Sequence, residues 1–283
     1  MFAVVNRTTE ETKVKAAYVK SNMLDFAVLE TLVHPSVDDP FSGMQVKWAV
    51  NAGPAMMQPA VRSRDFVYVE STGMTTMSTG ERVGFQLLHS IYLPGAPELH
   101  KYKFVRGNMT LYHLFWQKSD GVVELYIKAF IDLMGAVPLC MATMLSTSGV
   151  VLVSKLGEYA LMKKLNWLLH QRGEIVPSDR FKLCHVCSKI IKSTIMRRRT
   201  CKVCMSKCCT RCCVSTTMFF VAPQSQGVAQ KIVNVCKNCI QTASFINGLD
   251  VAKDELLNGS KQFKAYVYWS TTSMTTSTLS LRM

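Results

Sequence analysis

Cysteines are the residues of this chain whose type and spacing most clearly indicate chemistry. Ten of the 11 lie between Cys184 and Cys239, and eight of those form four C-x-x-C pairs. The pairs are Cys184 with Cys187, Cys201 with Cys204, Cys209 with Cys212, and Cys236 with Cys239. Each such turn brings two thiolates to one metal ion, and zinc takes four ligands in a tetrahedron. The spacing therefore predicts two zinc ions as the cofactor of this chain.

The third pair has neighbours that leave its pairing open. Cys208 and Cys213 flank it, and Cys208 with Cys212, or Cys209 with Cys213, would have three residues between them. Cys209 with Cys212 has the two that the turn requires. His185 lies between two better ligands, so we expect it to be a solvated loop residue.

Positive charge is concentrated around these cysteines. The chain has a formal net charge of +14, and residues 178–241 hold 12 of its 33 Lys and Arg but one of its 19 acids, Asp179. Such a patch attracts phospholipid head groups or nucleic acid. No signal peptide opens the sequence, and paired C-x-x-C units without one indicate metal in a reducing compartment, so we expect a cytoplasmic protein.

The segment before the cysteines predicts an α+β domain. Thr8 or Thr9 can cap a helix over residues 8–22, and residues 25–33 fit a helix or a strand. Short turns separate strand-like segments at 47–50, 64–71, 81–92, 102–106, 109–118 and 122–130, which is typical of an antiparallel sheet. Residues 148–172 read as a long helix with a broad apolar face. A curved sheet closed by such a helix would enclose a cavity.

One uncharged segment, residues 133–154, is long enough to cross a bilayer. Gly135, Pro138 and Gly149 interrupt it, so we favour a buried break between a strand and a helix over a membrane span.

Residues 179–239 resemble the FYVE zinc finger, a phosphoinositide-binding module with four C-x-x-C pairs. The family's basic stretch around the third cysteine corresponds to RRRTCK at 197–202, and its RVC element to NVC at 234–236. Arg199 and Thr200 stand where the family has two histidines, and Asn234 stands where it has an arginine. The WxxD element is reduced to Val176 and Asp179.

This resemblance implies a cross-brace finger. Cys184, Cys187, Cys209 and Cys212 would hold one zinc, and Cys201, Cys204, Cys236 and Cys239 the other. The anion-binding residues would be Arg197, Arg198, Arg199 and Lys202, and the apolar loop before them, with Ile195 and Met196 at its tip, would insert into a membrane. The partner would be the acidic phospholipid surface of endosomes or other intracellular membranes, and its specific lipid would be phosphatidylinositol 3-phosphate.

Residues 1–173 resemble a START domain, the helix-grip lipid-binding fold, joined to a FYVE-like finger as in oomycete proteins. The resemblance rests on RDFVYVESTG at 64–73, GERVGFQLLHSI at 80–91 and KKLNWL at 163–168. The segment is short for such a domain, so we expect it to lack the first helix and strands. A lipid would occupy a cavity lined by residues that include Tyr68, Phe85, Tyr112 and Trp116, and Arg106 or Glu70 would orient its polar group.

The expected organisation is thus a START-like domain at 1–173, a finger at 178–247 and a disordered Ser/Thr-rich tail at 264–283. No nucleophile elbow, phosphate loop or metalloprotease motif is present, so we expect no enzyme. The predicted function is a zinc-containing peripheral membrane protein that holds a lipid; the alternative is an adaptor whose finger binds a protein. The finger has few aromatic residues to stack on bases, which argues against nucleic acid.

Overall fold

The structure of the protein is a computed structural model that describes residues 1–52, 61–119, 121–137, 142–143, 153–171, 183–191, 198–221 and 227–258. The chain divides into two compact units, Met1–Leu156 and Gly157–Met283. The sequence predicted a boundary between residues 173 and 178, so the observed division comes one helix earlier. The predicted tail at 264–283 lies outside the described residues.

The first helix, α1 (Thr9–Val19), begins where the sequence predicted a cap. The hydroxyl of Thr8 accepts a hydrogen bond from the backbone N–H of Glu11 at 3.2 Å, and the Glu11 carboxylate accepts one from Arg7 N at 2.7 Å. These two bonds satisfy N–H groups that a helix start would otherwise leave unpaired. Lys20, in the left-handed region with φ 54°, ends the helix.

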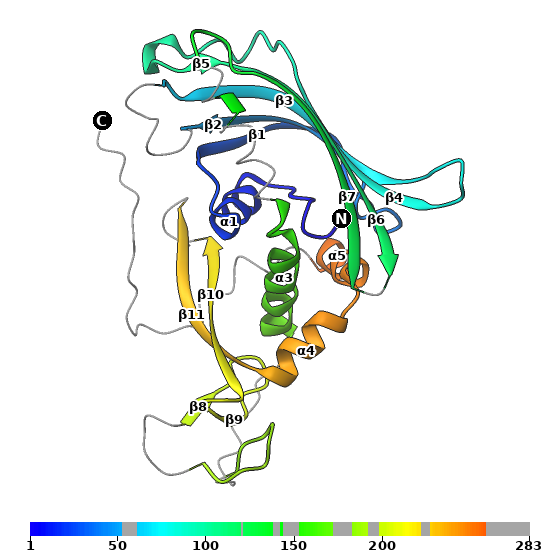
Figure 1. The fold of residues 1–283 in the computed structure, drawn as a ribbon, viewed down its shortest axis with the longest axis vertical. Coiled ribbons are helices and arrows are strands. Elements are labelled where there is room, and N and C mark those ends of the chain that lie inside the picture. The colour runs from blue at the N-terminus through cyan, green and yellow to red at the C-terminus, as the bar shows by residue number, and fades with distance from the viewer. Residues whose placement is uncertain are drawn as a thin grey trace. The chain divides into compact units, whose positions relative to one another are not determined.

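A curved, mostly antiparallel sheet makes up most of the first unit (Figure 1). Its strands are β1 (Met23–Val33), β2 (Gly43–Asn51), β3 (Arg64–Thr76), β4 (Arg82–Ser90), β5 (Val105–Arg106), β6 (Asn108–Ser119) and β7 (Val122–Asp132). The order is β1-β2-β3-β4-β6-β7, and β5 pairs in parallel with the start of β3. A short 3₁₀ turn, η2 (His100–Tyr102), precedes β5. The α+β class and the antiparallel sheet predicted from the sequence are confirmed.

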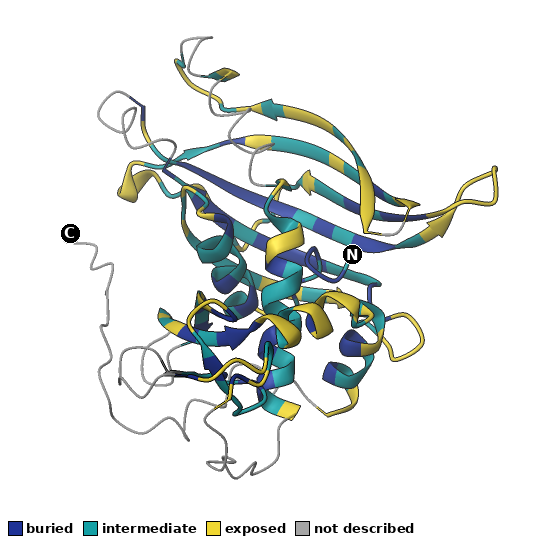
Figure 2. Ribbon diagram, turned by 60° about the horizontal axis from the view of Figure 1, so that its bottom comes forward, coloured by how far each residue is buried: buried dark blue, intermediate teal, exposed yellow. Residues whose placement is uncertain are grey.

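The middle strands carry the core of the first unit, as Figure 2 shows. On β3, Phe66, Val67 and Tyr68 are each at most 5% exposed although neighbouring side chains point to opposite faces. Both faces of β3 are therefore covered.

Along the chain, the second unit consists of one helix, two small β-hairpins and then two more helices. Its elements are α3 (Leu156–Gln171), β8 (Arg198–Thr200), β9 (Lys207–Cys209), β10 (Cys213–Val221), β11 (Val228–Cys236), α4 (Lys237–Phe245) and α5 (Gly248–Leu257). Strands β8 and β9 pair, and β10 pairs with β11 over nine residues from Cys213 opposite Cys236 to Val221 opposite Val228.

Helix α3 is the long apolar helix that the sequence assigned to the first domain, but from Gly157 onward it belongs to the second unit. Its residues Leu165 and Leu169 are buried in one apolar cluster with Met218 of β10 and Val235 of β11. The indole N–H of Trp167 also donates to Asp254 Oδ2 on α5, at 2.7 Å. The apolar face of α3 is thus used within the second unit.

None of the helices in the described part of the chain is long and apolar enough to span a membrane. Most of the uncharged segment at 133–154 lies outside the described residues.

Candidate metal centres and apolar groove

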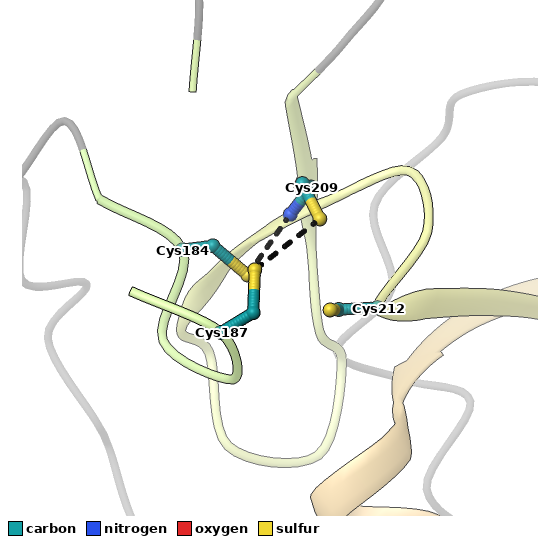
Figure 3. Close-up of side chains that lie close together, drawn as sticks. All are labelled: Cys184, Cys187, Cys209 and Cys212. Atoms are coloured by element: carbon teal, nitrogen blue, oxygen red, sulfur yellow. Dashed lines mark hydrogen bonds between the residues drawn. The ribbon is translucent and has the colours of Figure 1, made fainter. Parts of the chain in front are cut away.

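Two groups of four cysteine sulfurs converge in the second unit. One group joins the first and third pairs and the other joins the second and fourth, and within each group the four sulfurs lie within 4.8 Å of one another. The groups are Cys184, Cys187, Cys209 and Cys212, and Cys201, Cys204, Cys236 and Cys239. Figure 3 shows the first group, in which the side chains of two C-x-x-C pairs come together.

The spacing of the sulfurs fits zinc. Four sulfurs at about 2.3 Å from a tetrahedrally coordinated zinc lie about 3.8 Å apart. The observed Sγ–Sγ distances are 3.9 Å for Cys187 and Cys209, and 3.8 Å both for Cys201 with Cys239 and for Cys204 with Cys236. A disulfide would require about 2.05 Å. The two groups could therefore each hold one metal ion, and their sulfur spacing fits tetrahedral zinc.

The first two C-x-x-C turns share one backbone geometry. The N–H of Ser188 donates to Cys184 O at 2.8 Å, and the N–H of Met205 donates to Cys201 O at 2.9 Å. Both Ser188 and Met205 adopt the left-handed conformation, with φ 54° and 58°. Each turn closes directly after its second cysteine and so presents both sulfurs on the same side.

Backbone N–H groups point at the sulfurs and favour the thiolate form. Cys209 N lies 3.3 Å from Cys184 Sγ, and Cys236 N lies 3.3 Å from Cys201 Sγ. Burial alone would raise the pKa of Cys184, but the hydrogen bonds from backbone N–H groups, that of Cys209 foremost, outweigh it and lower the pKa to about 6. Cys236 caps helix α4, where the helix dipole favours a negative sulfur, but its side-chain hydrogen bonds with Cys201 and Cys204 raise its pKa overall.

The structure distinguishes the ambiguous cysteines. Cys208 and Cys213 are both buried, at 0% and 2% exposure, but neither sulfur joins a group of four. Burial raises the pKa of Cys208 to about 12 and that of Cys213 to about 11, which keeps both as neutral thiols. His185 is in neither group either, and its backbone N–H donates to Lys207 O at 3.0 Å.

Basic residues lie on strands β8 and β11 and in the turn that follows β8. Arg199 Nη1 donates to Ser215 Oγ at 2.9 Å, and Ser215 Oγ donates to Asn234 Oδ1 at 2.9 Å. The N–H of Lys202 donates to Asn234 O at 2.8 Å. Burial, and then the charge of Lys202, lower the pKa of Lys231 on β11. Lys231 is thus a cation of this region that the sequence did not single out.

Several predicted membrane-contact residues cannot be placed. Ile195, Met196 and Arg197 lie outside the described residues, and so does the side chain of Arg198. Val176 and Asp179 lie outside them as well.

A groove of about 230 Å³ lies in the first unit, between α1 and the concave face of the sheet. Its walls come from α1, from strands β1, β2, β3, β4 and β6, and from the segment just before α3. The lining residues are Asn6, Thr12, Lys15, Ala16, Val19, Ser21, Met23, Phe26, Lys47, Tyr68, Glu70, Gln86, Leu88, His113, Val153 and Leu156. Most of the lining surface is apolar.

Polar side chains in the groove form one connected network. Lys47 Nζ and Gln86 Nε2 both donate to the carboxylate of Glu70, and Lys47 also donates to Asn6 O at 3.1 Å. His113 Nδ1 lies 3.0 Å from Gln86 Oε1. Burial would raise the pKa of Glu70, but the charges of Lys47 and Lys15 and the two side-chain hydrogen bonds lower it overall. Glu70 is therefore ionised and paired inside the groove.

The predicted cavity residues divide between the two faces of the sheet. Tyr68 and Glu70 line the groove, whereas Phe85, Tyr112 and Trp116 are not among its lining residues. Phe85 and Tyr112 lie one position before Gln86 and His113, which do line it, so they point to the other face. Trp116 lies on the same face as Tyr112, and its Nε1 donates a hydrogen bond to Glu124 Oε2 at 3.1 Å.

Arg106 is engaged elsewhere. It forms a bidentate contact with Asp65 Oδ2, at 2.8 and 3.0 Å, and donates to the carbonyls of Ala96 and Pro97. Asp65 is fully buried. This pair holds the loop before β5 against β3 and leaves the polar role in the groove to Glu70.

No protein-family model matches this chain, and no curated protein matches it. Among solved structures, human StAR-related lipid transfer protein 5 is similar, with 16% sequence identity and a TM-score of 0.38. The similarity covers 51% of this chain and 62% of that protein, so the chain spans less than two thirds of its length. A similarity this low assigns no function to this chain.

Proposed function

We propose that this protein binds a hydrophobic lipid in the groove of its first unit. The observation that carries the proposal is the groove itself, which has apolar walls and a connected set of polar side chains at one place. Apolar surface supplies binding free energy, and a few fixed polar groups orient the ligand. An amphipathic molecule with a long apolar body matches both features.

We propose that the two cysteine groups hold structural zinc ions. Eight thiolates complete two tetrahedra, which leaves no open position for substrate. The metal sites would therefore stabilise the second unit rather than catalyse a reaction, and the protein would act by binding. Burial in the second unit supports this role, because the cysteines belong to its main apolar cluster.

Displacement of a neutral fluorescent probe, N-phenyl-1-naphthylamine, tests the groove directly. Ala16→Trp places a large side chain in the groove, whereas Ala17→Trp changes the next residue of the same helix, which does not line it. We expect the first variant to lose at least tenfold in probe affinity and the second to bind as the wild type does. Equal binding by both variants would show that the probe enters elsewhere.

We also propose that the second unit docks on acidic intracellular membranes, including endosomes that carry phosphatidylinositol 3-phosphate. Arg199, Lys202 and Lys231 support this, because all three add positive charge to the cysteine-rich part of the second unit. A single observation favours the alternative, an adaptor that binds a protein: Asn234, a neutral side chain, holds the position where the resembling family has an arginine, and it accepts a hydrogen bond from Ser215.

Liposome co-sedimentation of the full chain separates these readings. Vesicles with phosphatidylinositol 3-phosphate are compared with vesicles of equal total negative charge without it. The proteins are the wild type, Lys231→Gln and Lys253→Gln, a change on helix α5 outside the cysteine-rich segment. Docking predicts sedimentation that falls several-fold in the first variant and stays unchanged in the second. A preference for the 3-phosphate would establish specific recognition, whereas no sedimentation with either vesicle would favour a protein partner.

A further inference from the structure

The hydrogen-bond network of the groove fixes which atoms of its polar side chains remain available to a ligand. Glu70 is ionised, so its carboxylate can only accept hydrogen bonds. Lys47 donates to one carboxylate oxygen and the amide of Gln86 donates to the other. Gln86 therefore turns its N–H₂ group to Glu70 and its carbonyl oxygen, Oε1, to His113.

This orientation determines the tautomer of His113. Gln86 Oε1 is an acceptor, so His113 Nδ1, 3.0 Å away, must donate and must carry the proton. Burial and the nearby charge of Lys15 lower the pKa of His113 to about 4, so the ring is neutral at physiological pH. In a neutral ring protonated at Nδ1, Nε2 has a lone pair and accepts a hydrogen bond. Among the described residues, no donor to Nε2 is found.

We propose that the groove recognises a neutral alcohol whose hydroxyl group donates a hydrogen bond to His113 Nε2. The inference rests on the proposed lipid-binding function and specifies the chemical class of its ligand. The lining of the groove also includes apolar side chains, such as Leu88 on β4 and Phe26 on β1. A hydroxyl group satisfies the imidazole acceptor at little desolvation cost, whereas an ether or a hydrocarbon leaves it unpaired.

The volume of the groove bounds the size of the ligand. An engineered apolar cavity of roughly 150 Å³ holds one benzene molecule. At about 230 Å³, this groove holds an apolar body of roughly nine or ten carbon atoms by the same proportion. A medium-chain primary alcohol therefore fits, and longer chains would extend beyond the groove.

Four probes with similar apolar bodies test the assignment on the full chain by displacement of N-phenyl-1-naphthylamine: 1-decanol, its isomer methyl nonyl ether, undecane and decanoate. Decanol and the ether have the same atoms and differ in the hydroxyl donor. We expect decanol to bind about tenfold more tightly than the ether. We also expect undecane to bind no more tightly than the ether, because neither donates a hydrogen bond.

Two histidine variants locate the effect. His113→Phe should abolish the preference for decanol over the ether while the ether still binds. His89→Phe, a change of an exposed histidine that contacts Thr110 and does not line the groove, should leave the preference intact. A long-range ¹H–¹⁵N NMR spectrum of wild-type protein gives a reading that needs no variant, and it should show His113 protonated at Nδ1 and unprotonated at Nε2.

The outcomes distinguish failure of the hydroxyl assignment from failure of the proposed lipid-binding function. Equal affinity for decanol and the ether, tighter binding of decanoate than of decanol, or a proton on His113 Nε2 would overturn the hydroxyl assignment and leave lipid binding intact. Failure of all four probes to displace the dye would overturn the proposed lipid-binding function itself.

Discussion

Single residues in the cysteine-rich segment differ in role although they are adjacent in sequence. Cys208 and Cys209 are neighbours, yet the sulfur of Cys209 lies 3.9 Å from Cys187 Sγ, and the thiol of Cys208 points to Ser206 O at 3.7 Å. On strand β9 successive side chains point to opposite sides, so one of the two faces the metal site and the other faces the core.

This difference predicts the metal content of two variants. Cys209→Ser removes a thiolate ligand, so we expect the zinc content of the purified chain to fall from two ions to one. Cys208→Ser removes a buried thiol outside both groups and should retain two ions. Inductively coupled plasma mass spectrometry measures both. Two ions in Cys209→Ser, or one in Cys208→Ser, would show that the pairing is different.

His113 predicts a pH dependence of stability. Its pKa is lowered from 6.5 to about 4 in the folded protein, so below pH 6.5 the unfolded chain binds a proton that the folded one does not. The free energy of unfolding should therefore decrease as the pH falls from about 6.5 to about 4. Between pH 7 and pH 5 we expect a loss of about 1–2 kcal/mol from this residue.

Urea unfolding of the wild type and of His113→Gln, followed by tryptophan fluorescence, measures this contribution. The variant should lose less stability over the same pH range. An identical loss in both proteins would mean that other groups, such as Glu70, cause the whole dependence.

At the scale of elements, the strands of the sheet were largely predictable from the sequence. The unit in which helix α3 packs was not. Strand positions follow from alternation and turn residues, and Thr8 marks the start of α1 correctly. The apolar face of α3 is equally visible in the sequence, but periodicity does not say which partner covers it. Its partners, such as Met218 and Val235, lie far along the chain, so only the structure shows the contact.

The packing of α3 predicts a stability difference between two leucines. Leu165 is fully buried in the cluster of the second unit, and Leu257, on α5, is 69% exposed. Leu165→Ala should lower the free energy of unfolding of the second unit by about 3 kcal/mol because it leaves a cavity. Leu257→Ala should change it by less than about 0.5 kcal/mol. Urea unfolding followed by Trp167 fluorescence tests the pair, and equal effects would contradict the placement of α3.

The sequence also did not specify which face of each strand lines the groove. The sequence identified the strands and placed Tyr68 and Glu70 on the lining, yet it chose Phe85, Tyr112 and Trp116, on the opposite face. Both faces of these strands carry apolar residues, so alternation alone does not distinguish inside from outside. The informative signal was polar: Gln86 and His113 interrupt apolar strands on the same face as Glu70. For the cysteine pairs the two faces of a strand did not have to be distinguished, because the C-x-x-C spacing alone predicts the turns.

At the scale of the whole molecule, the proposed metal sites and the groove belong to different units. All groove residues lie in Met1–Leu156, and both cysteine groups lie in Gly157–Met283. Removal of zinc by a strong chelator should therefore unfold the second unit, seen as a red shift of Trp167 fluorescence, while probe binding in the groove falls by less than about twofold. Loss of both signals together would show that the two units fold as one.

Native mass spectrometry of the intact chain, sprayed with 1-decanol, tests the central claim that this is a zinc-containing lipid-binding protein. We predict a folded species that carries two zinc ions and one decanol molecule. In Ala16→Trp the alcohol should be lost and both ions retained. A folded chain without zinc, or a decanol adduct that persists in Ala16→Trp at wild-type level, would contradict the assignment of the metal sites or of the groove, respectively.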